Sequence, residues 1–494
     1  MSTFGLLLIP FVAAVTLLSG VPVYVALLAG TVIGAAGGLA AGTLTPGILQ
    51  SVVPRLINLL ESDILQALPL FVLMGVLLNR LPAVGAVFRC SAWLLRLSPA
   101  APIASGFALG ALLGPMSGSV GASVTALARA VDPPLVKAEV PAATRGAVVA
   151  VAGTLGVVVP PSLVLILLGD AMLYAHNFAI NVTGRPDRVI NTQDLMRGAL
   201  VPAALFLAVC LAIAVWSGRA GHAGAPRPTK PSAHEVLIAL ATIASLLVLL
   251  GGVATGRFYA VEAAACGCVA LLSWFVVSGA AGNGGLVAVA DRVMVETGAL
   301  FAPLVAATSF TLVLRLLGSD KLIEAWIAAL PGGEMVAIAV ILGALAVLAL
   351  ALDAFEIIFV AVPILVPALL IKVSDAVWGG VLVLLVIQAS FLLPPIGYAW
   401  VLSRSSIEAP APAGQAFWAI APYLAGQLAV VALVLAMPAL VHMLDPPGSR
   451  ERGPPAGAAP ASADEMLRQL PPAPSIGVLP PFQLEPPRPA PSQR

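Results

Sequence analysis

The sequence predicts an all-α polytopic membrane protein made of two inverted structural repeats with broken helices and re-entrant hairpins. Three observations carry this prediction. The 494-residue chain is 60% hydrophobic and only 10% charged, whereas soluble domains carry about 25% charged residues. Several uncharged stretches are longer than a membrane crossing requires. Proline pairs interrupt two of these stretches at matching places in the two halves of the chain.

The uncharged stretches set the number of membrane elements. The longest are residues 103–128, 146–169, 236–256 and 377–403, and each can cross the bilayer or enter it and return. At about 20 residues per crossing, the chain has room for roughly ten to thirteen membrane-embedded elements. The apolar N-terminal run lacks a basic leader, so we expect a first span and not a cleaved signal.

Two polar segments divide the chain. Residues 217–235 form a linker with Arg219, Arg227 and Lys230, and the positive-inside rule predicts that this linker is cytoplasmic. We expect a first membrane repeat over residues 1–216 and a second over residues 236–444. The remaining residues, 445–494, are rich in proline and poor in large aliphatic side chains. They cannot bury enough surface to fold, so we expect a disordered tail with at most one short helix near residues 464–470.

The repeat is indicated by prolines that recur at one offset. Four prolines of the first half have counterparts 234 positions later: Pro69/Pro303, Pro133/Pro367, Pro160/Pro394 and Pro161/Pro395. Adjacent prolines break a helix, and the freed backbone groups are tolerated in a membrane only inside protein or beside a watery cavity. Matching breaks in two halves are typical of secondary transporters, which bind substrate and ions there. The alternative is a pair of packing kinks.

A cluster of hydroxyl groups lies in an otherwise apolar stretch. The candidate ion or substrate ligands are Ser117, Gly118, Ser119, Gly121 and Ser123, since hydroxyl and carbonyl oxygens suit an alkali cation. The alternative is close helix packing, because glycines recur there every four residues from residue 106 and again from residue 30. We assign packing to the earlier glycines and a functional tip to residues 117–123.

Two acids lie deep in a long apolar run. Asp353 and Glu356 occupy the stretch ALALDAFEIIFVAV, and an ionisable group inside a membrane is functional by default because its burial is costly. At the offset of 234 positions, Asp353 falls opposite Ser119. The two residues are therefore candidate pseudo-symmetric partners. The alternative is a carboxylate that a neighbouring helix satisfies or that faces a hairpin mouth.

Several classes of protein are excluded by missing motifs. The chain has no phosphate-binding Gly-x-x-x-x-Gly-Lys loop, which argues against an ATP-driven pump. It also has no His-Glu-x-x-His or Gly-x-Ser-x-Gly motif, so we expect no enzymatic activity and no cofactor. The net charge of +1 gives no indication of nucleic-acid binding.

Several segments together resemble the large membrane subunit (M subunit, DctM family) of tripartite ATP-independent periplasmic (TRAP) transporters. The resemblance covers about residues 5–443. It rests on ALPLFVLMGVLLNR, MSGSVGASVTALARAVDPPLVK, GTLGVVVPPSLVLILLGD, ATSFTLVLRLLGSDKLIE, and LDAFEIIFVAVPILVPAL followed by SFLLPPIGYAW. The sequences of these motifs are most similar to the family branch that is often labelled mannitol or chloroaromatic compound.

The resemblance implies an elevator-type permease of the bacterial inner membrane. It implies sodium-coupled uptake of a small organic anion, a carboxylate, which a periplasmic substrate-binding protein delivers, and a separate small membrane (Q) subunit. Motif matching places the sodium and substrate regions at the serine-rich tip and at further residues of both halves: Thr154, Gly156, Pro160, Pro161, Ser162, Thr308, Ser309, Asp353, Ser390, Pro394, Pro395 and Gly397.

The chain departs from the family pattern in two motifs. Many members carry an acid in an Ala-Gly-Glu-Leu-Met segment, where this chain has Val76. A second motif keeps Glu262 and loses its proline. Two other functions stay open: a single-component transporter or antiporter coupled to protons or sodium, and a non-transporting scaffold in which the glycines serve only assembly.

Overall fold

The computed structural model describes residues 1–445 apart from 117–118, 161, 186, 220–228, 255, 283 and 395–396. All regular structure in these residues is helical. Eight of their helices are long and apolar enough to cross a membrane, or nine with the bent pair of residues 46–60 and 65–80. Six shorter apolar helices accompany them. The all-helical, multi-span fold class is therefore confirmed. The short helix that we expected near residues 464–470 lies outside the described residues.

The first half of the chain begins with long spans and continues with shorter, broken helices. In order these are α1 (Ser2–Ser19), α2 (Val23–Ala40), α3 (Pro46–Leu49), α4 (Val52–Leu60), α5 (Asp63–Arg80), α6 (Ala83–Leu94), α7 (Ala101–Leu113), the 3-10 helix η1 (Gly114–Met116), α8 (Val120–Lys137), α9 (Ala142–Val158), α10 (Leu163–Thr183) and α11 (Thr192–Arg219).

The second half repeats this order of long and short helices. It comprises α12 (Ala233–Ala254), α13 (Ala260–Val277), α14 (Gly285–Leu316), α15 (Ser319–Ala329), α16 (Gly333–Leu348), α17 (Ala354–Glu356), the π-helix η2 (Ile357–Ala361), α18 (Val362–Lys372), α19 (Ala376–Phe391), α20 (Tyr398–Ser406), α21 (Ala413–Ala436) and the 3-10 helix η3 (Pro438–Leu440).

Helix bounds in the two halves correspond at the offset of the prolines. Shifting α7 by 234 positions gives residues 335–347, and the observed α16 covers residues 333–348. Shifting α9 gives residues 376–392, and α19 covers residues 376–391. The same shift brings α1 onto α12, α2 onto α13 and α8 onto the α17–η2–α18 run. These bounds support the proposal that the chain contains two structural repeats.

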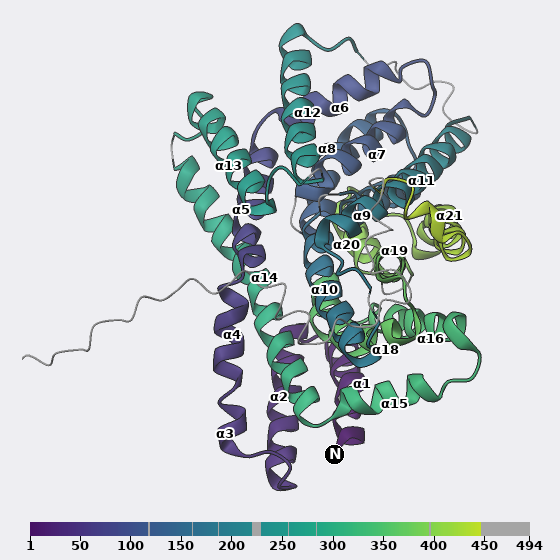
Figure 1. Cartoon of the computed structure of the whole chain (residues 1–494). Coiled ribbons are helices and arrows are strands. Elements are labelled where there is room, and N and C mark those ends of the chain that lie inside the picture. The colour runs from purple at the N-terminus through teal and green to yellow at the C-terminus, as the bar shows by residue number, and fades with distance from the viewer. Residues whose placement is uncertain are drawn as a thin grey trace, which may run out of the picture. The chain divides into compact units, whose positions relative to one another are not determined.

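Contacts divide the helices into an outer frame and a core. In the frame, α14 packs against α2 and α5, and α5 packs against α13 (Figure 1). In the core, α9 contacts α7, α8, α19, α20 and α21, while α10 packs on α18. Every residue of α19 is buried, as is α9 from Arg145 onward except Gly156. The short helices that end at the proline breaks therefore form the centre of the protein.

Glycines allow the core helices to approach closely. A Cβ atom added to Gly110 would lie 2.5 Å from the carbonyl oxygen of Ala152, and one added to Gly114 would lie 2.6 Å from the Cα atom of Gly156. In the frame, a Cβ atom on Gly30 would lie 2.8 Å from the ring of Phe310. The packing interpretation is therefore confirmed at Gly30, Gly110 and Gly114, where a larger residue would displace a neighbour. It does not hold for Gly42, which has nothing within 4 Å of an added Cβ atom, and Gly118 lies outside the described residues.

Candidate functional site

Each half of the chain contains a helical hairpin whose second arm begins at a capping side chain. Ser119 precedes α8, and its hydroxyl oxygen accepts a hydrogen bond from the Ala122 amide at 3.1 Å. Asp353 precedes α17, and its carboxylate accepts a hydrogen bond from the Ala354 amide at 2.8 Å. Both residues are N-caps with extended backbone. The two positions thus have the same local role, one through a hydroxyl and the other through a carboxylate.

The first proline pair breaks a membrane crossing between α9 and α10. The α9 helix ends at Val158 and α10 begins at Leu163. A helical carbonyl normally bonds the amide four residues later, and a proline at that position has none to offer. The Ser162 hydroxyl donates to the carbonyl oxygen of Val157 at 2.8 Å and accepts from the Leu165 amide at 3.0 Å. One side chain therefore satisfies both ends of the break.

The second proline pair breaks the crossing formed by α19 and α20. The helix α19 ends at Phe391, and α20 begins at Tyr398. A Cβ atom added to Gly397 would lie 2.6 Å from the carbonyl oxygen of Phe391, so the chain doubles back on itself there. Only glycine fits such an approach without displacing backbone. The breaks predicted at both proline pairs are present.

Buried amide side chains join the two broken crossings. Gln388 lies 234 positions after Thr154, and its Nε2 atom lies 3.5 Å from the Thr154 carbonyl oxygen. The Gln427 Nε2 atom donates to Gln388 Oε1 at 2.7 Å and to the Leu385 carbonyl oxygen at 3.2 Å. Gln388 and Gln427 are fully buried. Repeat-related residues therefore meet directly in the core, through uncharged hydrogen bonds.

The serine-rich segment meets the second broken crossing through Tyr398. A Cβ atom added to Gly121 would lie 2.6 Å from the Tyr398 hydroxyl. Tyr398 is also close enough to Asp353 and Glu356 to interact with their charges. Segments from both halves of the chain thus converge on one region that contains hydroxyls, helix ends and two carboxylates.

Two buried side-chain oxygen atoms near this region have no hydrogen-bond partner among the described residues. They are Glu356 Oε2 and Thr308 Oγ1. The neighbouring contacts show that α14 runs alongside η2 and α18. Thr311 Oγ1 donates to the Phe359 carbonyl oxygen at 2.8 Å, and Arg315 Nη2 donates to that of Pro363 at 2.8 Å, both 48 positions apart. Thr308 and Glu356 are also 48 positions apart, so we infer that they lie at the same height along these packed helices.

The other candidate residues have ordinary local roles in the described structure. Ser309 donates to the Val305 carbonyl oxygen and Ser390 to that of Val386, each within its own helix. Thr154 likewise donates to Val151. Gly156 lies against Gly114, and Ser123 is buried. Pro160 and Pro394 lie at the breaks, whereas Ser117, Gly118, Pro161 and Pro395 lie outside the described residues.

Residues that the sequence analysis did not select complete the region. Gln388 and Tyr398 were missed, although the offset of 234 positions from Thr154 could have indicated Gln388. Tyr398 directly follows the second break, but its contact with Gly121 depends on the tertiary structure.

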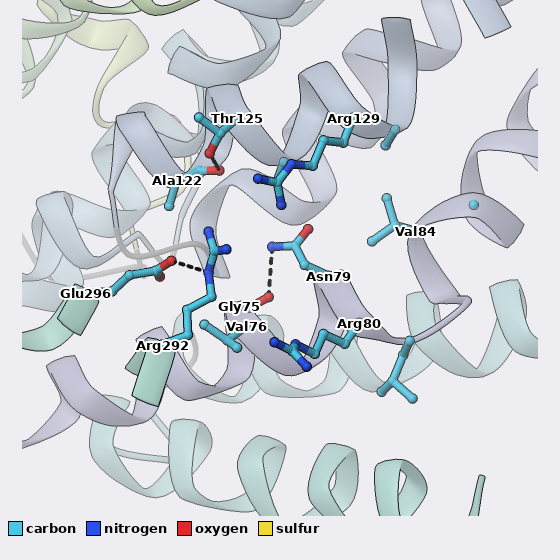
Figure 2. Close-up of a pocket in the computed structure, with 14 residues that line it drawn as sticks. Gly75, Val76, Asn79, Arg80, Val84, Ala122, Thr125, Arg129, Arg292 and Glu296 are labelled. Carbon is cyan, nitrogen blue, oxygen red and sulfur yellow. Dashed lines mark hydrogen bonds and ion pairs between the residues drawn. The ribbon is translucent and has the colours of Figure 1, made fainter. Parts of the chain in front are cut away.

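A cavity of about 420 Å³ lies between α5, α8 and the first part of α14. We call it the arginine cavity, because Arg80, Arg129 and Arg292 line it together with Asn79 and Glu296. Figure 2 shows these side chains turned toward a common space. Val76, which replaces the family's acid, also lines it. The sequence analysis did not find this cavity, because its arginines are far apart in the chain.

A second cavity, of about 260 Å³, is lined by residues of both halves of the chain. Thr308 and Arg315 of α14, Arg55 of α4, and Asp170 and Tyr174 of α10 line it. Arg315 is already engaged there, because its Nη1 atom donates to the Tyr174 hydroxyl at 2.7 Å and its guanidinium lies over the Tyr174 ring.

A family model decides the family of this chain. The model described as "Tripartite ATP-independent periplasmic transporter, DctM component" matches residues 10–440. The chain belongs to this family. It is therefore a multi-pass permease of the bacterial inner membrane and not an enzyme, as the sequence analysis predicted.

Known proteins similar to this TRAP permease agree on family and fold. The "C4-dicarboxylate TRAP transporter large permease protein DctM" of Rhodobacter capsulatus is 26% identical over 231 residues, which are 46% of this chain and 52% of that protein. The match thus spans about half the length of the curated relative. The crystal structure of the Alcanivorax borkumensis YdaH transporter, described as having an unusual topology, gives a TM-score of 0.53 at 16% identity. It covers 79% of this chain and 87% of YdaH, and at this identity it supports the fold alone.

Proposed function

We propose that this TRAP permease imports a small organic dianion, a dicarboxylate, and couples uptake to sodium. The observation that carries the proposal is the convergence of both hairpins and both broken crossings, through Gly121–Tyr398 and Thr154–Gln388, on one region of the core. Substrate and ions in inverted-repeat transporters bind where such interrupted helices meet. The chain's motifs also place it nearest the branch labelled mannitol or chloroaromatic compound, from which we take no substrate.

The oxygen chemistry of the region supports sodium as the coupling ion. Alkali cations take oxygen ligands, and this region offers hydroxyl and carbonyl oxygens at the ends of broken helices. The hydroxyl groups of Ser162 and Thr154 donate their protons to backbone carbonyls, and Ser162 also accepts from the Leu165 amide. A hydroxyl oxygen has two lone pairs, so each of these oxygens can still offer one to a cation. Asp353 adds a carboxylate at the equivalent hairpin. Sodium bound there is cargo that moves with the substrate.

Two observations support the class of substrate: the helix N-termini near the site and the name of the similar permease from Rhodobacter capsulatus. The N-termini of α8 and α10 carry the positive end of the helix dipole, which favours a carboxylate. The named substrates of the Rhodobacter capsulatus permease are C4-dicarboxylates. We infer a similar substrate here, delivered by a periplasmic binding protein to a complex of this chain with a small membrane subunit.

Uptake by a reconstituted complex tests this function. The chain, its small subunit and its binding protein would be placed in proteoliposomes, and uptake of labelled succinate would be followed with and without an inward sodium gradient. We expect accumulation only with the gradient. Equal accumulation under a proton gradient alone would remove sodium from the proposal.

A second candidate is proton coupling through the acids, and the unpartnered Glu356 oxygen favours it. A buried carboxylate oxygen that no described residue satisfies is more easily accommodated when the carboxyl group is protonated, which suits a proton carrier. Asp353→Asn and Glu356→Gln would be compared for uptake at matched sodium gradients. Under the sodium proposal Asp353→Asn weakens the sodium dependence. Under the alternative, Glu356→Gln abolishes a response to external pH and leaves the sodium dependence unchanged.

A further inference from the structure

We propose that the arginine cavity binds the carboxylate groups of the transported dianion on the cytoplasmic side of the permease, as a site of substrate release. This inference rests on the proposed function for its substrate class. It goes beyond that function in assigning a second anion site, which adjoins the region where the hairpins converge because Ala122, next to Gly121, lines the cavity.

The cavity carries an excess of positive charge. Three guanidinium groups, those of Arg80, Arg129 and Arg292, face one carboxylate, that of Glu296. An anion that enters is therefore attracted from several sides, and arginine binds carboxylates with two parallel hydrogen bonds.

Most hydrogen-bond donors of these arginines remain available. The Arg292 Nε atom donates to Glu296 Oε1 at 2.7 Å, so both terminal nitrogens of Arg292 can still donate to a ligand. Arg80 makes one contact, from Nη2 to the Ala288 carbonyl oxygen at 3.3 Å. Within the described part of the chain, the Arg129 guanidinium has no hydrogen-bond or ion-pair partner. The donors are held in place from three different helices and are not consumed by the protein.

The arrangement fits a molecule with two carboxylates. Figure 2 shows Arg129 and Arg80 on opposite sides of Asn79, with the Arg292 guanidinium beside it. Asn79 donates its amide to the Gly75 carbonyl oxygen at 2.9 Å, which orients the side chain. A volume of about 420 Å³ lies within the usual range of small-molecule sites, about 300 to 1,000 Å³.

The position of α6 gives the side of the membrane. Val84 and Gly85, at the start of α6, line the cavity. Further along α6, Arg89 forms a salt bridge of 2.7 Å with Glu235 in the first turn of α12. The basic linker directly precedes α12, and the positive-inside rule predicts that it is cytoplasmic. The arginine cavity therefore lies toward the cytoplasm.

The second cavity has a different balance of charge. Its two arginines, Arg55 and Arg315, are accompanied by Asp170, and Arg315 already donates to Tyr174 and Pro363. Among the described lining residues, the first cavity thus has three guanidinium groups to one carboxylate, and the second has two to one, with one of its two guanidinium groups engaged. This asymmetry favours anion binding in the first.

Equilibrium binding of succinate tests the site without transport. The full chain, in lipid nanodiscs at constant ionic strength and saturating sodium, would be titrated with succinate by calorimetry. We expect Arg129→Gln and Arg292→Gln each to weaken binding by about tenfold, the loss of one charge-assisted contact. Glu296→Gln removes the one carboxylate among the described lining residues and is expected to tighten binding. Arg96→Gln is the matched control, because Arg96 stacks on Trp93 outside the cavity.

The outcomes separate this site from the proposed function. Unchanged succinate affinity in both arginine variants, or an equal loss in Arg96→Gln, overturns the arginine cavity even if sodium-driven uptake is normal. Failure of the wild-type chain to bind succinate overturns it too. If binding depends on the arginines while uptake ignores sodium, the site stands and the coupling proposal fails.

Discussion

Side chains at the helix breaks replace missing backbone partners. Ser119 and Asp353 both cap the helix that follows a hairpin tip, and Ser162 bonds both flanks of a proline break. Each makes a hydrogen bond to a backbone group that the helix leaves unpaired. An unpaired amide or carbonyl is costly in a membrane, because lipid contains no water to satisfy it. Such residues therefore stabilise the fold at the same points where oxygen atoms are available to an ion.

Ser162→Ala is expected to destabilise the permease. The change leaves the Val157 carbonyl and the Leu165 amide without their partner in a buried position, at a cost of about 1 to 3 kcal/mol. Thermal unfolding of the purified protein in detergent measures it. Ser405→Ala is the control, because the exposed Ser405 hydroxyl donates only to Leu402 within its helix. Equal unfolding midpoints for both variants would contradict the double role of Ser162.

At the level of helices, glycine decides which elements can form the centre. The α7 helix approaches α9 so closely that Gly110 faces the Ala152 backbone, whereas Gly343, on the corresponding helix α16, has open space around it. The two hairpins are thus related in sequence position but not equally packed.

Gly110→Ala is expected to destabilise the protein by about 1 to 3 kcal/mol, because the added methyl group collides with the backbone of α9. Gly343→Ala is the matched change. It adds the same methyl group where nothing lies within 4 Å, so we expect no loss and a gain of up to about 1 kcal/mol from helix propensity. Unfolding midpoints give the comparison, and a similar loss in both variants would show that the close approach is not the cause.

The end of the membrane region is tied to α19 by a histidine. His442 Nε2 lies 2.6 Å from Asp375 Oδ2 and Nδ1 lies 2.8 Å from Asp445 Oδ2, while Asp375 also caps α19 through the Trp378 amide. The hydrogen bond to Asp375 is the main reason that the pKa of His442 is raised above its usual 6.5.

Stability is therefore expected to fall as the pH rises through this raised pKa. A group whose pKa is higher in the folded state stabilises the protein fully below its unfolded pKa, here about 6.5, and the contribution disappears above the folded value. Unfolding midpoints measured from about pH 6 to about pH 9 check this. His442→Gln should flatten the profile, and a wild-type profile that rises over this range would contradict the assignment.

At the level of the whole molecule, a buried ion pair joins the two halves of the chain. Arg145 Nη1 lies 2.5 Å from Asp132 Oδ1, and Arg145 Nη2 donates to the Glu408 carbonyl oxygen at 3.0 Å. The second Asp132 oxygen accepts from the Glu408 amide at 2.9 Å. Residues after α20 are thereby held against α8 and α9.

Asp132→Ala is expected to cost about 3 to 5 kcal/mol, because Arg145 is left buried without its counter-charge. Arg89→Gln breaks the exposed pair with Glu235 and should cost less than about 1 kcal/mol. Unfolding midpoints compare the two. A small effect of Asp132→Ala would mean that water replaces the carboxylate.

The sequence alone determined the fold class, the helix breaks and the repeat offset. The length of an apolar stretch, a pair of prolines and the spacing of glycines each act on neighbouring residues. Their effect on the local structure therefore does not depend on the rest of the fold. Through the offset of 234 positions the sequence also indicated that Ser119 and Asp353 occupy equivalent positions, whereas their capping roles came from the structure. Motif resemblance supplied the family, which the family model confirmed over residues 10–440.

Only the tertiary structure decided which of these segments meet. The contacts of Gly121 with Tyr398 and of Thr154 with Gln388 join residues more than 200 positions apart, and no local pattern encodes them. The arginine cavity likewise collects Arg80, Arg129 and Arg292 from three helices. The sequence shows which residues are charged but not which charged side chains face one another. A binding site arises only when packing turns separate side chains into one space.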